Sequence, residues 1–225
     1  MGWSYIIVTD GSQLDRVNSI ISSIKLQPMR YLEDNTEILV IGGKENNYKL
    51  WPNDVFIPFD EKREPAAIAK KKNIAFNAAK YQNISVGHDY VAYGYGFFEG
   101  FKSFLNWDVC MTPILTRNGQ RYRDWVLYDD DKEQSQNPYA IKWLDYNDAT
   151  KTNRMYVSGA FYCIKKDFAL KYPLEDWRTW GRCEDIEWSL RVRDKWNYKI
   201  NQSVNVNLLK DKDVWPPYSK EWNWQ

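Results

Sequence analysis

Buried strands alternate with amphipathic helices from the first residues of this 225-residue chain, and this alternation limits its fold more than any other feature. The run WSYIIVTDG (residues 3–11) is apolar and rich in β-branched residues, and it ends in Asp-Gly, which predicts a buried strand and a turn. Leu14, Val17, Ile21 and Ile24 then recur at the spacing of a helix. Such alternation predicts an α/β fold, in which a parallel sheet is joined by right-handed crossovers.

We expect Ser12 to cap this first helix, with Asp15 at the third position of a relaxed capping box. Two further buried strands follow the helix. EILVIGG (37–43) predicts a second buried strand, and DVFIPF (54–59) predicts a third, which Pro58 restricts to an edge or a strand end.

The pattern continues with another helix and strand. EPAAIAKKKNIAFNAAK (64–80) predicts a helix with Pro65 in its first turn. ISVGHDYVAY (84–93) predicts a strand that ends among polar residues. Because parallel sheets bind ligands beyond the carboxyl ends of their strands, we expect one rim to carry a set of polar and glycine residues. These are Thr9, Asp10, Gly42, Gly43, His88 and Asp89.

The second half of the chain is less regular. FLNWDVCMTPILT (104–116) and MYVSGAFYCIKK (155–166) predict strands, and RNGQRYRDW (117–125) predicts a turn at Asn-Gly. The polar run at 128–139 predicts a surface loop. With no repeat and no linker in the sequence, we expect a single domain over residues 1–225.

Composition excludes several classes of protein. Apolar residues make up 44% of the chain, which suits a packed core, and 31 basic against 30 acidic residues give a net charge of +1. This balance indicates neither a nucleic-acid partner nor a membrane surface. We find no signal peptide or membrane span, and Cys110, Cys163 and Cys183 are odd in number and widely spaced. We therefore expect buried thiols in a soluble, cytoplasmic protein.

Seven of the 12 tryptophans lie between Trp177 and the end of the chain. Any single one is more simply explained as a core residue, but together they favour a carbohydrate ligand, because indole rings make flat platforms for sugar rings.

The stretch TWGRCEDIEWSLRVR (179–193) predicts a helix that opens with Glu184 and Asp185. Acidic residues in a first turn complement the helix dipole, and Glu187 with Arg191 makes an i,i+4 pair, so helix chemistry alone explains the pattern. The second interpretation is that one of the two acids is a catalytic base. This stretch by itself favours the first interpretation, in which the acids only stabilise the helix.

The rest of the chain changes this balance. The order strand, helix, strand, followed by KKKNIAFNAAKYQNISVGHDY (70–90), VSGAFYCIKKDF (157–168) and WGRCEDIEWSLRVR (180–193), resembles the nucleotide-sugar-dependent glycosyltransferases of the GT-A fold, in particular the large family 2. The resemblance covers most of the chain. It implies a single domain with a mostly parallel central sheet flanked by helices. Residues 1–110 or so would bind the nucleotide sugar, and about 111–225 would bind the acceptor.

The resemblance also implies roles for residues. Asp185 would be the general base of an inverting transfer, and Glu184 would bind or orient the acceptor. His88 and Asp89 fall on the family's Asp-x-Asp motif and become candidate ligands for Mn²⁺ or Mg²⁺. The remaining donor-binding candidates are Thr9, Asp10, Gly11, Gly43, Glu45, Lys72 and Asn73, and the acceptor-binding candidates are Ser158, Gly159, Trp180 and Gly181. By analogy with the family, a UDP-sugar is the favoured donor and a saccharide, a lipid-linked sugar or a protein is the acceptor.

Three departures from the family pattern matter. Gly42-Gly43 replaces an acidic pair that reads the base and ribose, so selectivity would come from Asp10 or Glu45. Both outer positions of Asp-x-Asp are changed, and the downstream histidine is absent, with Asn205 or Asn207 nearby instead. A divalent ion would therefore bind weakly.

Several cationic residues have two interpretations each. Lys72 would either bind the phosphates of the donor or belong to a solvated helix face formed by residues 70–72. Lys210 and Lys212 are further candidates. Arg121, Arg123 and Asp124 would either clamp an acceptor or lie on the outer face of a hairpin.

Two rival functions remain open. A non-catalytic carbohydrate- or nucleotide-sugar-binding module on a degenerate GT-A fold suits the altered Asp-x-Asp, although the intact Glu-Asp helix opposes it. A nucleotidyltransferase usually carries a glycine-rich loop with a basic residue after its first strand, and TDGSQLD (9–15) has no such residue.

Overall fold

The computed structural model describes residues 2–28, 35–44, 47–128 and 141–212, so most of the loop expected at 128–139 lies outside the described residues. The first half contains β1 (Trp3–Val8), α1 (Leu14–Lys25), β2 (Thr36–Ile41), β3 (Val55–Ile57), α3 (Ile68–Ala78), β4 (Asn83–His88), β5 (Val91–Tyr93) and α4 (Phe97–Gly100). The second half contains β6 (Val109–Met111), β7 (Ile114–Leu115), β8 (Val126–Tyr128), β9 (Ile141–Trp143), a 3₁₀ turn at Thr152–Arg154, β10 (Met155–Tyr156), β11 (Phe161–Lys165), α6 (Lys166–Lys171), α7 (Glu184–Val192), β12 (Tyr198–Ile200) and β13 (Val206–Leu208).

Within the described residues, seven strands form one central sheet in the order β12-β6-β11-β4-β1-β2-β3. β1 runs parallel to β2 and β4, β2 to β3, and β12 to β6, whereas β11 is antiparallel to both of its neighbours. The predicted mostly parallel α/β sheet is therefore confirmed. Every residue of β1 and β2 is buried, and the polar pair within them is satisfied because Ser4 Oγ donates to Glu37 Oε1 at 2.6 Å.

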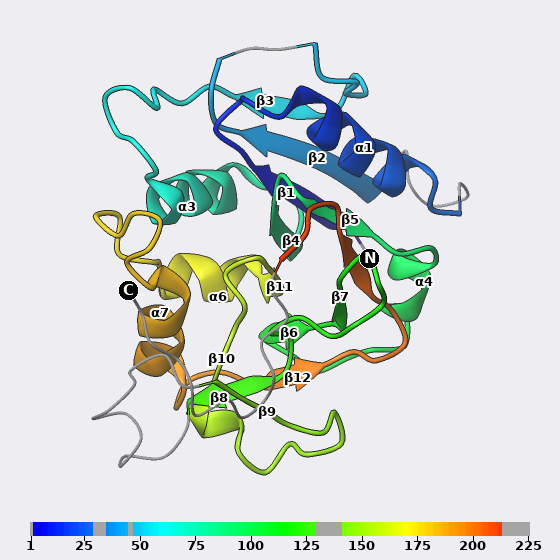
Figure 1. Ribbon diagram of the computed structural model, residues 1–225, viewed down its shortest axis with the longest axis vertical. Coiled ribbons are helices and arrows are strands. Elements are labelled where there is room, and N and C mark those ends of the chain that lie inside the picture. The colour runs from blue at the N-terminus through cyan, green and yellow to red at the C-terminus, as the bar shows by residue number, and fades with distance from the viewer. Residues whose placement is uncertain (1, 29–34, 45–46, 129–140, 213–225) are drawn as a thin grey trace.

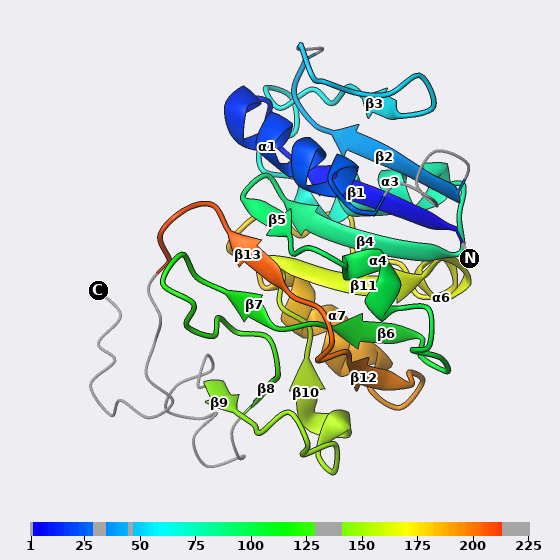
Figure 2. The same ribbon diagram turned by 90° about the vertical axis from the view of Figure 1, so that its right-hand side faces the viewer.

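Layers on both faces cover this sheet. Figures 1 and 2 show α3, α6 and α7 on one face, and α1, α4 and the small sheet β5-β13-β7 on the other. A third sheet, β10-β8-β9, lies on the β12 side of the molecule (Figure 1). Under α4, the core is aromatic: the ring of Trp3 packs edge-on against Phe101 at 4.7 Å. No helix in the described segments is long and apolar enough to cross a bilayer.

Three of the expected strands are each divided in two. The chain turns at Asp89–Tyr90 between β4 and β5, at Thr112–Pro113 between β6 and β7, and at residues 157–160 between β10 and β11. In each case one part belongs to the central sheet and the other pairs in a small sheet. The turns place polar residues at the edge of the central sheet, where the candidate site lies.

The starts of two helices differ from expectation. The prediction that Ser12 caps α1 is wrong, because Gln13 is the N-cap residue and Ser12 N–H instead donates to Asp10 Oδ1 at 2.8 Å. The prediction that Pro65 lies in the first turn of α3 is also wrong, because that helix begins at Ile68. Ala66, with φ of 55°, turns the chain so that its carbonyl accepts hydrogen bonds from Ile68 N and Trp180 N.

Candidate active site

The carboxyl ends of β1 and β4 lie side by side and bring Thr9 into contact with Asp89. Thr9 Oγ1 donates to Asp89 Oδ2 at 2.9 Å, and Asp89 N–H donates to Val8 O at 3.0 Å. Burial would raise the pKa of Asp10, but hydrogen bonds from Ser12 and the charge of Lys71 lower it, so Asp10 is ionised at neutral pH. The structure thus gathers Thr9, Asp10 and Asp89 at one rim, as parallel strands require.

Gly42 and Gly43 let the turn after β1 cross the end of β2. A Cβ at Gly42 would lie 1.7 Å from Thr9 O, and one at Gly43 would lie 2.7 Å from both Asp10 O and Gly11 Cα. Both glycines also have positive φ, of 123° and 66°. A pair of acidic residues would not fit in this turn. The close packing therefore explains why Gly42 and Gly43 stand where the family pattern has two acidic residues. Glu45, the other candidate near this turn, lies outside the described residues.

His88 and Asp89 have different surroundings. The His88 ring stacks on Tyr90 with centroids 5.5 Å apart and planes 4° apart, while Asp89 bonds Thr9. Burial lowers the pKa of His88 well below its ordinary value, and the charges of Lys72, Lys71, Lys212 and Lys210 lower it further, so the imidazole is neutral at pH 7. Burial raises the pKa of Asp89, whereas the Thr9 hydroxyl and Arg16 oppose this rise.

The described residues do not form the ligand set expected for Mn²⁺ or Mg²⁺. No group of three or more His, Cys, Asp or Glu side chains among them is placed to hold a metal ion. Asp89 Oδ2 already accepts the Thr9 hydroxyl, and Asn205 Nδ2 donates to Asn207 Oδ1 at 3.2 Å within the small sheet. The residues near Asp89 therefore do not fit such an ion well, and we derive no chemical step through one.

The predicted acidic pair does open a helix. α7 begins with Glu184, and Asp185 is its second residue. Just before it, Gly181 and Cys183 take positive φ values of 81° and 52°, which turn the chain sharply into the helix. The start of a helix carries partial positive charge, which stabilises negative charge placed beside it.

Asp185 is held in place by two backbone amides. Gly159 N–H donates to Oδ2 at 2.7 Å, and Ile186 N–H donates to Oδ1 at 2.9 Å. Glycine at position 159 allows this close approach, because a Cβ there would lie 2.7 Å from Asp185 Oδ2 and would displace the carboxylate. Ser189 links the same two segments by donating to Asp185 O at 2.6 Å and accepting from Val157 N–H at 3.1 Å. The turn between β10 and β11 thus fixes the orientation of the carboxylate.

The charge state of Asp185 is unusual for an aspartate. Burial raises its pKa to about 6, and the neighbouring charge of Glu184 adds to the rise, while Lys72 and the two backbone hydrogen bonds oppose it. At pH 7 to 8 the carboxylate is mainly ionised and still basic enough to take a proton.

Lys72 contacts this acidic pair and not the solvent. Its ammonium lies 3.2 Å from Glu184 Oε1 and 3.3 Å from Gly159 O, and it faces the ring of Tyr162 at 5.3 Å. Its side chain is 1% exposed and that of Glu184 is 8% exposed. The interpretation of residues 70–72 as a solvated helix face is therefore wrong for Lys72. It is also wrong for Lys71, which bonds Glu61 Oε1 at 2.6 Å and Thr9 O at 2.8 Å.

Asn73 lies away from the donor candidates. Its amide binds the loop before α7: Nδ2 donates to Leu174 O at 2.8 Å and to Asp176 Oδ1 at 2.7 Å, and Oδ1 accepts from Leu174 N–H at 3.1 Å. Asn73 therefore fixes the loop over residues 173–183, and the structure does not bring it to the rim with Thr9 and Asp89.

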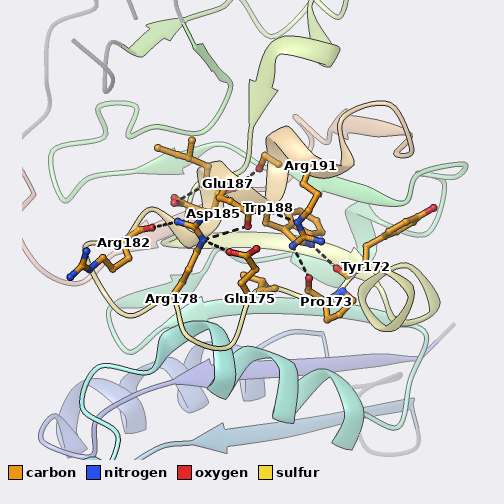
Figure 3. A network of polar contacts seen from close by, with 12 residues as sticks. Tyr172, Pro173, Glu175, Arg178, Arg182, Asp185, Glu187, Trp188 and Arg191 are labelled. Atoms are coloured by element: carbon orange, nitrogen blue, oxygen red, sulfur yellow. Dashed lines mark hydrogen bonds and ion pairs between the residues drawn. The ribbon is translucent and has the colours of Figure 1, made fainter. Parts of the chain in front are cut away.

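A network of polar contacts holds the same loop on α7 (Figure 3). Arg178 Nε lies 2.8 Å from Glu175 Oε2 and 3.6 Å from Glu187 Oε2, while Arg191 bonds Glu187 at 2.8 Å and Pro173 O at 2.8 Å. Two indole rings on this fixed loop face solvent, Trp177 at 64% and Trp180 at 71% exposure. The loop therefore presents aromatic surface just before the acidic pair. Ser158, by contrast, is buried.

Asp124 is an internal anchor and not an outward-facing charge. It is fully buried, and it accepts hydrogen bonds from Arg121 Nη2 at 2.8 Å, Trp125 N at 2.7 Å and Tyr146 Oη at 2.6 Å. Arg121 also stacks on Tyr146 at 3.9 Å. These contacts satisfy the buried carboxylate, so both expected roles for Arg121 and Asp124, acceptor clamp and outer hairpin face, give way to a structural one.

The two halves of the site meet at one end of the sheet. β4 and β11 are antiparallel neighbours, and His88 N–H donates to Ala160 O at 3.1 Å. Asp89 comes just after β4, and Gly159, whose N–H binds Asp185, comes just before β11. Because the two strands are antiparallel, both residues lie at the same end of the sheet. Tyr90, which the sequence analysis does not select, is buried next to Asp89: burial raises its pKa, and Tyr122, Asp89, Asp185 and Glu184 add to the rise.

Comparison with known proteins supports the architecture. No protein-family model matches the sequence, and no curated protein matches it significantly. TarS from S. aureus in complex with UDP-GlcNAc is 10% identical, with a TM-score of 0.65 over 94% of this chain and 60% of that one. GalNAc-T7 with UDP, GalNAc and Mn²⁺ is 14% identical, with a TM-score of 0.62 over 97% of this chain and 46% of that one.

The chain therefore spans less than two thirds of either structure. At these identities the similarity establishes the fold alone. Together with the mostly parallel central sheet and its single antiparallel strand β11, it identifies the fold of this chain as that of the GT-A glycosyltransferases.

Proposed function

We propose that this protein is an inverting glycosyltransferase that moves a sugar from a nucleoside diphosphate sugar to a saccharide, lipid-linked or protein acceptor. The observation that carries the proposal is Asp185: a carboxylate with a pKa of about 6, held by two backbone amides at the start of a helix. It shares one end of the sheet with Thr9 and Asp89, the candidate donor residues. A helix-dipole role alone needs neither the close contact with Gly159 nor the burial.

In the proposed reaction, Asp185 takes the proton of an acceptor hydroxyl. The hydroxyl oxygen attacks the anomeric carbon from the face opposite the diphosphate, the new glycosidic bond forms, and the nucleoside diphosphate leaves with the electrons of the broken bond. Each carboxylate oxygen accepts one backbone hydrogen bond and keeps a further lone pair for the proton. These bonds orient the base without occupying it.

The buried pair of Glu184 and Lys72 would tune this base. Glu184 lies next to Asp185 and raises its pKa, while Lys72 lowers it. Burial raises the pKa of Asp185 most, and the opposing effects of Glu184 and Lys72 adjust it to about 6. The expected contact of Glu184 with an acceptor stays a prediction, since its Oε1 is already 3.2 Å from Lys72.

Donor and acceptor would bind on opposite sides of Asp185. We propose that Thr9, Asp10 and Asp89 line the donor site and that the donor is a UDP-sugar. TarS with UDP-GlcNAc and GalNAc-T7 with UDP support this choice. The acceptor would contact the loop before α7, where the exposed ring of Trp180 suits a sugar and Gly181 shapes the chain.

Assays of donor hydrolysis and sugar transfer test the proposal. The purified protein is incubated with a panel of UDP-sugars, with and without mixed saccharide acceptors, and release of UDP is measured. We expect UDP release that increases with acceptor and is lost in Asp185→Asn. A protein that binds UDP-sugars but releases no UDP under any of these conditions would instead be a non-catalytic binding module.

A further inference from the structure

We propose that Trp177 and Trp180 form an extended acceptor subsite, which binds a saccharide chain of several sugar units beside Asp185. The inference rests on the proposed function and narrows it, because it selects a saccharide chain among the three classes of acceptor considered there. It also gives a role to Trp177, which the sequence analysis does not select as a site residue. The evidence is the exposure of two indole rings, the fixed loop that carries them and the position of that loop next to the acidic pair.

Trp177 and Trp180 are the two most exposed tryptophans in the described part of the chain. Their exposed fractions are 64% and 71%, whereas four other tryptophans are buried in the core. In the same described segments, their one ring interaction is with the guanidinium of Arg178, which lies 4.5 Å from the centroid of the Trp177 ring. Indole rings gain much from being covered, so two of them left in solvent on one loop indicate a surface that a ligand covers.

The loop that carries these rings is fixed from three sides. Asn73 of α3 and Arg191 of α7 each bond a carbonyl at its start at 2.8 Å, and Figure 3 shows the second of these contacts. On the third side, Trp180 N–H donates to Ala66 O at 2.9 Å. A loop held in this way loses little conformational freedom when a ligand binds, so the two rings form a preformed surface.

Backbone strain supports the position of Trp180. Ala66 has a φ of 55°, in the left-handed region that residues with a side chain rarely adopt. Its carbonyl accepts Ile68 N–H at 2.8 Å as well as Trp180 N–H, so one strained residue ties the start of α3 to the loop. Strain of this kind persists only where surrounding contacts hold it, and it is concentrated at functional sites.

The loop leads directly into the acidic pair. Residues 181–183 alone separate Trp180 from Glu184, and Asp185 follows. The three-residue step from Trp177 to Trp180 spans at most about 11 Å between Cα atoms, so both rings lie within reach of one short saccharide chain. A chain whose terminal sugar offers its hydroxyl to Asp185 would extend over Trp180 and then over Trp177.

The surroundings of the two rings favour a sugar over a lipid or a protein. Asp176 and Arg182 are exposed beside them, and Arg178 lies against Trp177. The C–H face of a sugar ring packs on an indole, while its hydroxyls can bond carboxylate and guanidinium groups. Charged groups are depleted in the core of protein interfaces, and they are costly in a lipid bilayer.

A glycan array tests the subsite, with neutral and acidic saccharides of one to six units as probes. The variants are Trp177→Ala and Trp180→Ala, together with Trp177→Phe and Trp180→Phe, which keep a smaller ring. Tyr95→Ala is the matched control, because Tyr95 is an aromatic residue with 83% exposure that lies just before α4, on the opposite face of the sheet. Vesicles of phosphatidylcholine and phosphatidylglycerol are a second probe, and thermal unfolding curves confirm that each variant is folded.

We expect the wild type to bind saccharides with an affinity that rises with chain length. Each alanine variant should bind the longer saccharides about 5- to 10-fold more weakly, each phenylalanine variant should lose less, and the control should stay within about twofold of the wild type. Binding that survives in both alanine variants, equal binding of short and long saccharides, or no binding to any saccharide overturns the proposal. Binding of vesicles through the same rings without binding of saccharides also overturns it, because the loop would then be a membrane contact.

Transfer assays separate this proposal from the proposed function. With a UDP-sugar as donor, kcat/KM is measured for a short and a long saccharide from the array, and the ratio of long to short should fall by about 5- to 10-fold in Trp177→Ala. If saccharides bind through both rings but no UDP is released from any UDP-sugar, the subsite stands and the proposed function is wrong. If transfer proceeds and this ratio is unchanged in the variants, the proposed function stands and the subsite is wrong.

Discussion

Replacing Asp185 by asparagine should make the protein more stable and nearly inactive. Burial and Glu184 raise the pKa of this carboxyl from 3.8 to about 6 in the folded protein. A group whose pKa is higher in the folded state favours folding when protonated, and it loses that contribution as the pH rises through the folded pKa. At pH 7.5 the ionised Asp185 therefore lowers the free energy of unfolding by up to about 3 kcal/mol, at about 1.4 kcal/mol per pH unit.

Asparagine mimics the neutral carboxyl and retains an oxygen for Gly159 N–H. We expect Asp185→Asn to raise the free energy of unfolding by about 1–3 kcal/mol at pH 7.5, and to raise the melting temperature by about 2–4 °C for each kcal/mol. At pH 4 the gain should almost disappear, because the wild-type carboxyl is then protonated. Turnover should fall by about two to four orders of magnitude, because the amide cannot take the proton.

Urea denaturation at pH 7.5 and pH 4, measured beside UDP release, tests both halves of the prediction. Asp167→Asn is the matched control, because Asp167 is also the second residue of a helix but is exposed. It should lose about 0.3–1 kcal/mol from the helix dipole and leave turnover unchanged. If Asp185→Asn behaves in the same way, losing a little stability and keeping its activity, the acids serve only the helix and the reasoning is refuted.

Four further predictions concern the same site and the fold. Turnover should rise with pH through an apparent pKa near 6, since the base acts when ionised, and a profile that is flat from pH 5 to 8 would contradict this. Glu184→Gln should move this limb to lower pH by removing the charge that raises the pKa of Asp185, and should lower the free energy of unfolding, measured in urea, by about 1–3 kcal/mol, because Lys72 exchanges a charged partner for a neutral one. Gly159→Ala should displace the carboxylate and reduce kcat by about 100-fold in a folded protein, because its Cβ would lie 2.7 Å from Asp185 Oδ2; a kcat within twofold of wild type would show that this contact is not needed. Limited proteolysis should not release two stable halves near residue 110, since strands from both halves share the central sheet; two fragments that each unfold cooperatively would contradict the single domain.

The expected stability gain in Asp185→Asn follows from the way such a site is built. A base active near neutral pH needs a raised pKa, and burial beside a second carboxylate provides one at the expense of stability. Residues 173–183 carry many stabilising contacts next to it, through Asn73, Arg178 and Arg191. These contacts keep the loop in place although the ionised Asp185 lowers the stability of the fold.

The sequence by itself determined the elements whose pattern is local. The runs at Trp3–Val8 and Thr36–Ile41 are buried strands, because stretches made mainly of apolar and β-branched residues have few other places in a folded protein. The glycine and acidic residues at 181–185 mark a helix start for similarly local reasons, since left-handed backbone and a helix dipole act over a few residues. Parallel pairing then put Thr9 and Asp89 at one rim.

Only the tertiary structure decided the partners. Lys72 looked like part of a solvated face because its partner Glu184 is 112 positions away in the sequence, and Arg121 and Asp124 turned inward to meet Tyr146. The break at Asp89–Tyr90 arises where the chain leaves one sheet for another, which no local propensity encodes, whereas Pro113 marks the break after β6 in the sequence itself. The pKa of Asp185 depends on its burial first, and then on Glu184, Lys72 and Gly159 together. Burial and charge pairing are properties of the packed molecule, so the chemistry of the site emerges only when these segments meet.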